Sequence, residues 1–212
     1  QAALVTGAAS GLGEATAREL ARLGAKVAVL DVNAALAEKV AAEIGGVACV
    51  CDITNTDSVL AALAKAGAAH GPARILMNIA GIGTAKRIVG KDGSPAPLDD
   101  FARVINVNLI GSYNISRLFA AECVKLSPLE DGERGVMMFT ASVAAFDGQV
   151  GQQAYSASKG GLVGMTLPMA RDLAQHGIRV CTVAPGLFAT PLMKELPEAV
   201  QASLAASIPF PP

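Results

Sequence analysis

Short apolar runs alternate along the chain with segments whose hydrophobic residues recur every three or four positions. Runs of four to six apolar residues without polar alternation are typical of strands that are covered on both faces of a sheet. They predict strands at 2–6, 26–30, 47–50, 75–78, 136–140 and 179–184. The 3.6-residue periodicity predicts helices over 12–23, 34–44, 56–69, 98–124, 155–176 and, as a short segment, near 191–196.

Regular alternation of strands and helices requires right-handed crossovers between parallel strands. The pattern therefore predicts an α/β protein of the Rossmann type, a doubly wound parallel sheet between two helical layers. We expect residues 1–212 to form a single dinucleotide-binding and catalytic domain, in which residues from about 186 to 212 act as a lid over the substrate. In such a fold the ligand binds at the carboxyl ends of the strands.

Composition narrows the classes of function. The chain has 212 residues, 52% hydrophobic and 17% charged, which suffices for one substantial core. The net charge of −1 provides no field that would attract nucleic acid. No apolar run reaches the ~18 residues that a membrane span needs, and no signal-peptide pattern is visible. We therefore expect that the protein binds no nucleic acid and is not associated with a membrane.

Four cysteines stand at positions 49, 51, 123 and 181, without the spacing of a zinc site or a disulfide framework. We expect them to be buried apolar thiols. This use of cysteine fits a reducing compartment, and we predict a cytoplasmic location, with the mitochondrial matrix as the alternative. We expect no bound metal.

A glycine-rich turn follows the first predicted strand, in the segment from Leu4 to Gly13. Gly7 permits a tight turn, Gly11 lets the backbone approach a pyrophosphate, and Gly13 lets the following helix lie close to the strand. Because unpaired N–H groups and the helix dipole point at the ligand, such a turn is an anion site. Ser10 and Leu12 lie within it.

The second predicted strand ends at Asp31, eighteen residues after Gly13. This is close to the ~20-residue spacing of the acidic residue that binds the adenosine ribose of a dinucleotide. A carboxylate accepts hydrogen bonds from the 2′- and 3′-hydroxyls and repels a 2′-phosphate. No Arg or Lys stands in the glycine turn or directly after Asp31. We therefore predict NAD(H) as the cofactor rather than NADP(H).

Tyr155 and Lys159 are four residues apart and share one face of a predicted helix. An ammonium beside a phenol favours the phenolate, so we expect Lys159 to lower the pKa of Tyr155 from its usual ~10. The phenol would then exchange a proton with an alcohol or carbonyl near neutral pH. Ser142, thirteen residues upstream, could hold the same oxygen.

Together these motifs resemble the classical short-chain dehydrogenase/reductase family. The resemblance implies a catalytic set of Ser142, Tyr155, Lys159 and Asn108, in which Asn108 holds a water that joins Lys159 to solvent. It also implies further cofactor-binding positions, where Ile79 replaces the family's second Asn in the Asn-Asn-Ala-Gly motif. These positions are Asp52, Ile53, Asn78, Ala80, Gly81, Pro185, Gly186 and Thr190, and the catalytic Tyr155 and Lys159 are cofactor-binding as well.

One branch of the family, the type-II 3-hydroxyacyl-CoA dehydrogenases, is especially similar to the segments 142–152, 155–172, 184–188 and 82–97. This similarity implies a 3-hydroxyacyl-CoA/3-oxoacyl-CoA pair as substrate and a role in fatty acid metabolism, with hydroxysteroids as an alternative. Gln149, Gln152 and Phe188 are candidate substrate residues beside Ser142. Lys86, Arg87 and Lys91 either meet CoA phosphates or form a solvated basic loop.

The resemblance assigns Pro185, Gly186 and Thr190 to the nicotinamide of the cofactor. The apolar residues in and after this segment either form a lid or make plain core contacts. They are Leu187, Phe188, Leu192, Met193, Leu196, Leu204, Ile208 and Phe210. The helix over 155–176 is apolar around most of its circumference, which predicts burial on all sides and a second subunit on one of them. We expect a homodimer or homotetramer.

Family members continue through another strand after the point where this sequence stops, so we expect a fragment that lacks the C-terminal strand. Three rival functions remain. A 3-oxoacyl reductase should prefer NADPH, which Asp31 opposes. A sugar-nucleotide epimerase shares the Tyr-x-x-x-Lys motif but has a different glycine spacing. A non-enzymatic NAD(H)-binding assembly protein is the alternative from another class.

Overall fold

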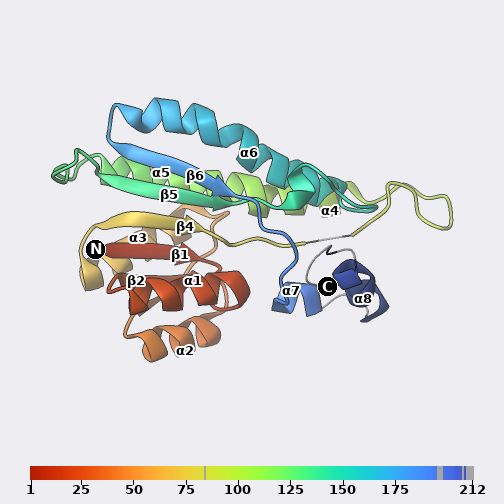
Figure 1. Ribbon diagram of the computed structural model, residues 1–212, viewed down its shortest axis with the longest axis horizontal. Helices are drawn as coiled ribbons and strands as arrows, with labels where there is room; N and C mark the ends of the chain where they lie inside the picture. Colours follow the sequence, from red (N-terminus) through yellow and green to blue (C-terminus); the bar gives the residue numbers. More distant parts are fainter. Residues whose placement is uncertain (84, 195–197, 207, 209–212) are drawn as a thin grey trace.

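A six-stranded parallel sheet organises the computed structural model, which describes residues 1–83, 85–194, 198–206 and 208. The strand order is β3-β2-β1-β4-β5-β6, and every neighbouring pair is parallel. The chain crosses from one half of the sheet to the other between β3 and β4, so the ends of β1 and β4 diverge into a crevice. Figure 1 shows the strands side by side with helices around them. The strands are β1 (Ala2–Thr6), β2 (Lys26–Asp31), β3 (Val47–Val50), β4 (Ala73–Asn78), β5 (Gly135–Thr140) and β6 (Ile178–Val183).

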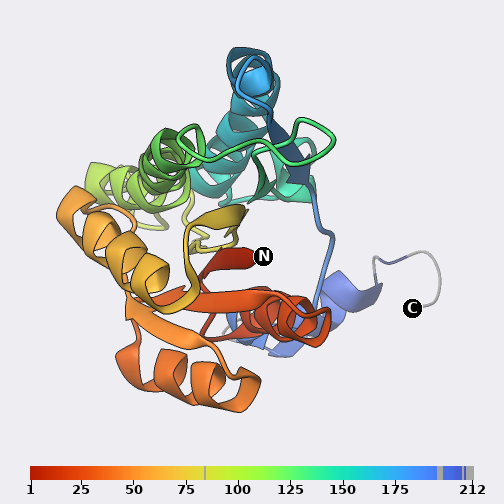
Figure 2. The same ribbon diagram turned by 90° about the vertical axis from the view of Figure 1, so that its left-hand side faces the viewer.

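Helices lie on both faces of this sheet, although one face of β6 is left uncovered by the described residues (Figure 2). Side chains alternate along each strand, so Leu4 of β1 enters one core and its neighbour Val5 enters the other. The first core lies beneath α3 (Thr56–His70), α5 (Ser112–Cys123) and α6 (Gln153–Ala174). The second lies beneath α1 (Gly11–Arg22) and α2 (Ala34–Ile44). The predicted doubly wound α/β fold is confirmed.

The predicted helix over 98–124 contains a π-helical segment in its middle. It consists of α4 (Leu98–Ile105), π-helical Asn106–Gly111 and α5, which follow one another without a break. Gly111 lies against the side chain of Ile53, and a Cβ at that glycine would come within 2.7 Å of Ile53 Cγ1. π-helical segments are rare and are frequent at functional sites.

Helix α6 is less buried than its apolar composition predicts. Gly161 allows close approach to the helix before it, because a Cβ there would lie 2.8 Å from Leu109 Cδ2. Leu167 is 55% exposed, and Gly164 and Pro168 are also exposed. One side of α6 is thus uncovered in the single chain, and its burial by a second subunit stays a prediction.

The C-terminal helices lie beyond the carboxyl ends of the strands, as Figure 1 shows. They are α7 (Pro191–Lys194) and α8 (Glu198–Ala206), of which the sequence pattern predicted only the first. A long loop over 85–97 projects away from the sheet and carries one antiparallel bridge, Val89 to Pro95. None of the helices in the described residues is long and apolar enough to cross a membrane.

The cysteines follow the prediction in three of four cases. Cys49, Cys51 and Cys123 are buried, whereas Cys181 is exposed on β6. The difference arises because successive side chains of a strand point to opposite faces, and Cys181 lies on the face of β6 that the described residues leave uncovered. Among the described residues, no group of three or more His, Cys, Asp or Glu side chains could hold a metal ion.

Candidate active site

The glycine turn has the geometry of a dinucleotide cradle. Gly7 and Gly11 have positive φ angles of 63° and 55°, which other residues rarely adopt. A Cβ on Gly13 would collide with the carbonyl oxygen of Gly7, so only glycine lets α1 begin this close to β1. Ser10 is the N-cap residue of α1 and its side chain makes no capping hydrogen bond. The first N–H groups of α1 therefore remain available to an anion.

Thr6 joins the ends of β1 and β4 beneath this turn. Its hydroxyl oxygen accepts hydrogen bonds from the backbone N–H groups of Ile79 (3.0 Å) and Ala80 (3.1 Å). A Cβ on Gly7 would lie only 2.7 Å from Ala80 Cα. Gly7, Gly13 and Ala80 thus form the closely packed backbone under the crevice rather than its lining.

Asp31 holds the glycine turn directly. Its Oδ2 atom accepts a hydrogen bond from the Ala9 N–H at 3.0 Å, and its Oδ1 atom accepts one from Asn33 at 2.9 Å. Each carboxylate oxygen has a second lone pair for a ligand hydroxyl. A tight glycine backbone, a helix N-terminus and this carboxylate fit the diphosphate and ribose of NAD.

Asp52 and Ile53 lie beyond the end of β3. The Asp52 Oδ1 atom accepts hydrogen bonds from the backbone (2.9 Å) and hydroxyl (2.7 Å) of Thr54. Ile53 is buried, and its carbonyl accepts a hydrogen bond from Asn114 at 2.9 Å. Their contact with adenine stays a prediction.

The structure brings Ser142, Tyr155 and Lys159 together in one cavity of about 450 Å³. Ser142 follows β5, and Tyr155 and Lys159 lie on the first turns of α6. Predicted cofactor residues from the glycine turn line the same cavity, so the phenol and the cradle open into one space. The predicted site residues among its lining are Ser10, Gly11, Leu12, Gly81, Ser142, Gln149, Gln152, Tyr155, Lys159, Pro185, Gly186, Phe188 and Thr190.

Lys159 is only 4% exposed, and its Nζ atom donates a hydrogen bond to the Thr140 carbonyl at 2.6 Å. The ammonium lies 5.6 Å from the centroid of the Tyr155 ring. Burial lowers the pKa of Lys159 to about 8.

The expected direction of the Tyr155 pKa shift is wrong. Burial raises the pKa of Tyr155, because removal of the phenol from water disfavours the phenolate. A hydrogen bond with the Ser142 side chain works in the opposite direction but does not overcome burial. Since Lys159 directs its ammonium to Thr140, no hydrogen bond from Lys159 to the phenol offsets the desolvation.

Asn108 lies in the π-helical segment and is completely buried, outside the cavity lining. Its Oδ1 atom accepts from the Ile82 N–H at 2.8 Å, and its Nδ2 atom donates to the Ile82 carbonyl at 2.9 Å and to Ser158 Oγ at 3.0 Å. A Cβ on Gly81 would meet Asn108 Oδ1 at 3.2 Å and Lys159 Nζ at 3.5 Å. Asn108 therefore lies behind Lys159, with its amide engaged by the protein.

The segment after β6 bridges the crevice. The Pro185 carbonyl accepts a hydrogen bond from Val143 N–H at 3.0 Å, which fixes it beside Ser142. At the other end, a Cβ on Gly11 would lie 3.4 Å from Pro191 Cδ. Thr190 directly precedes α7, and its side-chain oxygen accepts a hydrogen bond from the Met193 N–H at 3.4 Å.

Gln149, Gln152 and Phe188 line the outer end of the cavity, and Gln152 Oε1 accepts from the Gln149 N–H at 2.9 Å. Of the suggested lid residues, Leu187, Met193 and Leu204 also line it, whereas the described Ile208 does not. The side chain of Leu192 and the residues Leu196 and Phe210 lie outside the described part of the chain. Sequence reasoning missed several further lining residues, of which Asp147 is the charged one.

The basic loop turns away from the cavity. Lys86 forms an ion pair with Asp100 and lines a smaller, separate cavity of about 250 Å³. Arg87 and Lys91 are exposed.

Comparison with known proteins decides the family. The family model for short chain dehydrogenases matches residues 1–201. The chain belongs to the short-chain dehydrogenase family.

Relatives and solved structures agree with this result. The chain is 51% identical over 211 residues to 3-hydroxyacyl-CoA dehydrogenase type-2 of Drosophila melanogaster, with 98% of this chain and 83% of the relative covered. It is 50% identical to the Homo sapiens protein of the same name, with 99% of this chain and 81% of the relative covered. The crystal structure of 3-hydroxyacyl-CoA dehydrogenase type-2 from Mycobacterium avium superposes with a TM-score of 0.91 at 43% identity, covering 99% of this chain and 83% of that one. The resemblance to this branch is confirmed.

A departure from the family motif has a visible local effect in this short-chain dehydrogenase. Asn78 donates to Ser116 Oγ at 3.1 Å, while its Oδ1 atom is buried and has no partner among the described residues. Ile79, in place of the second Asn, packs against the core beneath α1 and lines the cavity. The backbone of Ile79 keeps its hydrogen bond to Thr6, so the crevice retains its shape.

Proposed function

We propose that this chain transfers a hydride between NAD(H) and a secondary alcohol or ketone, most directly a 3-hydroxyacyl-CoA/3-oxoacyl-CoA pair. The observation that carries the proposal is the shared cavity, in which Ser142 and Tyr155 face the same space as the glycine turn. Relatives at about half identity over nearly the whole chain carry the name 3-hydroxyacyl-CoA dehydrogenase type-2. A solved ketoacyl reductase with 34% identity and a TM-score of 0.82 was crystallised with NADH.

The residues that would hold NAD follow the crevice. The N-terminus of α1 would receive the diphosphate, and Asp31 would receive the adenosine ribose. Asp52 and Ile53 would meet the adenine. Gly81, which lines the cavity, would border the ribose next to it, and Asn78 and Ala80 would support that segment from beneath. Lys159, Pro185, Gly186 and Thr190 would hold the nicotinamide end, which supplies the hydride acceptor or donor when the cofactor is bound.

The protein's own groups manage the substrate oxygen and its proton. In the direction of reduction, Ser142 donates a hydrogen bond to the carbonyl oxygen and orients it. Tyr155, which burial keeps protonated, gives its hydroxyl proton to that oxygen as the alcohol forms. In oxidation Tyr155 takes the proton back. Lys159 places a positive charge beside the ring while the phenolate exists. Asn108 would hold a water through which Lys159 exchanges a proton with solvent.

The outer cavity wall supports an extended apolar substrate. We propose that residues 1–212 act as one catalytic domain in which the segment from about 186 to 212 closes over the substrate. Leu187, Phe188 and Met193 provide apolar contacts, while Gln149 and Gln152 offer hydrogen bonds. A hydroxysteroid fits the same apolar wall, and it is the second candidate substrate.

An exposed apolar surface supports a homodimer or homotetramer. Leu98 is 78% exposed on α4, and Ile110 and Tyr113 are about half exposed on the helix that continues it. Leu167 is exposed on α6, which contacts α4. We further propose a role in fatty acid metabolism and a cytoplasmic location, with the mitochondrial matrix as the alternative.

One assay separates the candidate functions. NADH oxidation is followed with acetoacetyl-CoA and, in parallel, with a panel of ketosteroids, and each assay is repeated with NADPH. Turnover of acetoacetyl-CoA with NADH supports the proposal, and preference for a ketosteroid supports the second candidate. Preference for NADPH supports a 3-oxoacyl reductase. NADH binding without turnover of any of these ketones would contradict the proposal and favour a non-enzymatic assembly protein.

A further inference from the structure

Ser158 occupies a completely buried position directly beneath the proposed catalytic turn. Its hydroxyl donates a hydrogen bond to the backbone carbonyl of Tyr155 at 2.7 Å. The same hydroxyl oxygen accepts a hydrogen bond from Asn108 Nδ2 at 3.0 Å. One side chain thus joins the turn that carries Tyr155 to the π-helical segment that carries Asn108.

The turn that carries Tyr155 lies at the very beginning of a helix. Helix α6 starts at Gln153, and its N-cap residue Gln152 makes no side-chain capping hydrogen bond. The first turn of a helix lacks part of the intrahelical hydrogen bonding that holds later turns, and it frays first. A phenol that must meet a substrate oxygen within hydrogen-bond reach therefore needs support from outside the helix.

Asn108 can provide that support because its own side chain is held in place by hydrogen bonds. Its amide binds both the N–H and the carbonyl of Ile82, which fixes it to the loop after β4. Both donor hydrogens of the amide are used, one by Ile82 and one by Ser158. If the Ser158 hydroxyl were removed, a buried N–H group would lose its partner and the Tyr155 carbonyl would lose its additional bond.

We propose that Ser158 is a positioning residue, which fastens the first turn of α6 to Asn108 and thereby holds Tyr155 and Lys159 in register with the substrate oxygen. The inference rests on the proposed dehydrogenase function. A misplacement of about 1 Å can lower a rate by ~10²-fold, so one internal hydrogen bond has a measurable effect on turnover.

The test compares Ser158→Ala with Thr166→Val. Thr166 lies two turns further along α6, is half-buried, donates to the Leu162 carbonyl at 2.7 Å and contacts the Thr182 hydroxyl, so it also joins the helix to a neighbouring element. We expect Ser158→Ala to lower kcat for acetoacetyl-CoA by about tenfold while the Kd for NADH stays within twofold. Thr166→Val is expected to leave kcat within twofold of the wild type.

Hydrogen exchange provides a readout that needs no substrate. Amide exchange of a peptide that covers residues 153–160 is expected to quicken at least about tenfold in Ser158→Ala and to stay unchanged in Thr166→Val. If Ser158→Ala does not fold, Ser158→Cys, which keeps a small side chain with a weak donor, replaces it in both measurements.

A double variant tests whether Ser158 acts through Asn108. If it does, adding Ser158→Ala to Asn108→Ala lowers kcat by clearly less than the product of the two separate effects. Each of three results would overturn the inference. The effects of the two substitutions on kcat multiply independently, the amide exchange of 153–160 is unchanged in Ser158→Ala, or the kcat of Ser158→Ala lies within twofold of that of Thr166→Val. Failure of the proposed function looks different, because the wild type itself would then turn over no ketone while the exchange result still decides the role of Ser158.

Discussion

The ammonium of Lys159 lies 5.6 Å from the centre of the Tyr155 ring and hydrogen-bonds the Thr140 carbonyl instead of the phenol. Any effect of the lysine on the tyrosine is therefore exerted through its charge and not through a hydrogen bond. Burial raises the pKa of Tyr155, so the phenol holds its proton at neutral pH. This arrangement prepares Tyr155 as a proton donor, the state that ketone reduction requires.

Replacement of Tyr155 by Phe tests the proton donor. The ring is kept and the hydroxyl is lost, so we expect turnover of acetoacetyl-CoA to fall at least ~10³-fold. NADH binding, measured by fluorescence titration, is expected to change less than twofold because the glycine turn and Asp31 are untouched. Residual turnover near the wild-type rate would show that another group supplies the proton.

The lowered pKa of the buried Lys159 leads us to expect that the free energy of unfolding depends on pH. Its pKa is about 8 in the folded protein and 10.5 in the unfolded chain, so between these values the unfolded state binds more protons. The free energy of unfolding attributable to Lys159 therefore rises with pH from about 8 to about 10.5, by on the order of 3 kcal/mol. The buried thiols, whose pKa values burial raises, act in the opposite direction.

A variant isolates the lysine from the thiols. Urea unfolding of the wild type and of Lys159→Met at pH 7 and pH 10 gives the difference in stability between the two proteins at each pH. We expect this difference to shift in favour of the wild type at pH 10, because only the wild type loses the burial cost of the charge. A difference that is the same at both pH values would show that Lys159 keeps its usual pKa.

Asp31 is expected to control the choice between NADH and NADPH. Val32 is 69% exposed directly beside it, so an arginine fits there without disturbing the core. The double change Asp31→Ser with Val32→Arg removes the repulsion of a 2′-phosphate and adds a cation. We expect the ratio of kcat/KM for NADPH to that for NADH to rise about 100-fold, measured with acetoacetyl-CoA. Val32→Arg alone is the control, and an unchanged ratio in the double variant would exclude this role of Asp31.

Gly13 is predicted to accept no side chain. A Cβ there collides with the carbonyl oxygen of Gly7, so Gly13→Ala must displace either α1 or the turn. We expect a loss of about 3 kcal/mol in the free energy of unfolding, together with loss of NADH binding.

Gly67 provides the matched control for this change. It lies inside α3, and a Cβ added there would meet no atom within 4 Å, so Gly67→Ala is expected to stabilise the protein by about 0.5–1 kcal/mol. Thermal unfolding of both variants measures the contrast. Equal stability of Gly13→Ala and the wild type would contradict the close packing of α1 on β1.

Light scattering tests the proposed assembly. We expect a mass of two or four chains for the wild type and a smaller mass for Leu167→Lys, because a charge would then be buried in an apolar contact. Leu23→Lys, on an exposed side chain at the end of α1, is the control and should keep the wild-type mass. A single-chain mass for the wild type would contradict the proposed oligomer.

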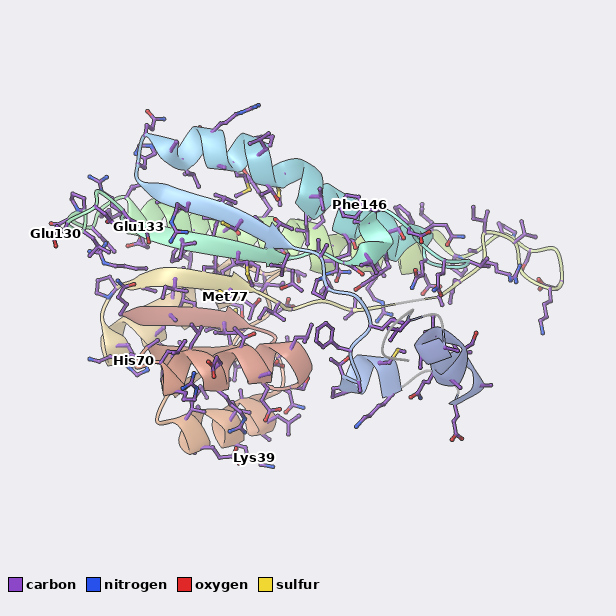
Figure 3. All side chains as sticks on the ribbon, viewed as in Figure 1. Lys39, His70, Met77, Glu130, Glu133 and Phe146 are labelled. Carbon is purple, nitrogen blue, oxygen red and sulfur yellow. The ribbon has the colours of Figure 1, made fainter. Side chains whose placement is uncertain are left out.

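The fold was predictable from the sequence because its strands are continuous apolar runs and its glycines stand at fixed intervals. Tyr155, Lys159, Ser142 and the glycine turn could be named for the same reason, since each belongs to a motif with local spacing. Not every side chain is placed by such a pattern. Figure 3 labels Met77, which lies among the strands as the apolar run predicts, and Phe146, which follows β5. Phe146 is exposed, and no periodicity in the sequence indicates this.

Properties that depend on tertiary packing could not be predicted. The residues from Leu98 to Cys123 have ordinary helical periodicity, and the π-helical segment is visible only once Gly111 meets Ile53. The direction of the Tyr155 pKa depends on how completely the phenol is removed from water, which spacing does not reveal. Asp147 lines the cavity through a loop whose path no motif specifies.

The number of residues in the π-helical segment sets how α5 is rotated about its axis relative to α4. An α-helix turns by about 100° per residue, so deletion of one residue between Ile105 and Ser112 would rotate α5 relative to α4 by that angle. Asn108 would leave Ile82, and the face of α5 that fills the core would swing toward water. A change of one residue in length within this segment would therefore disturb the core and the active site together.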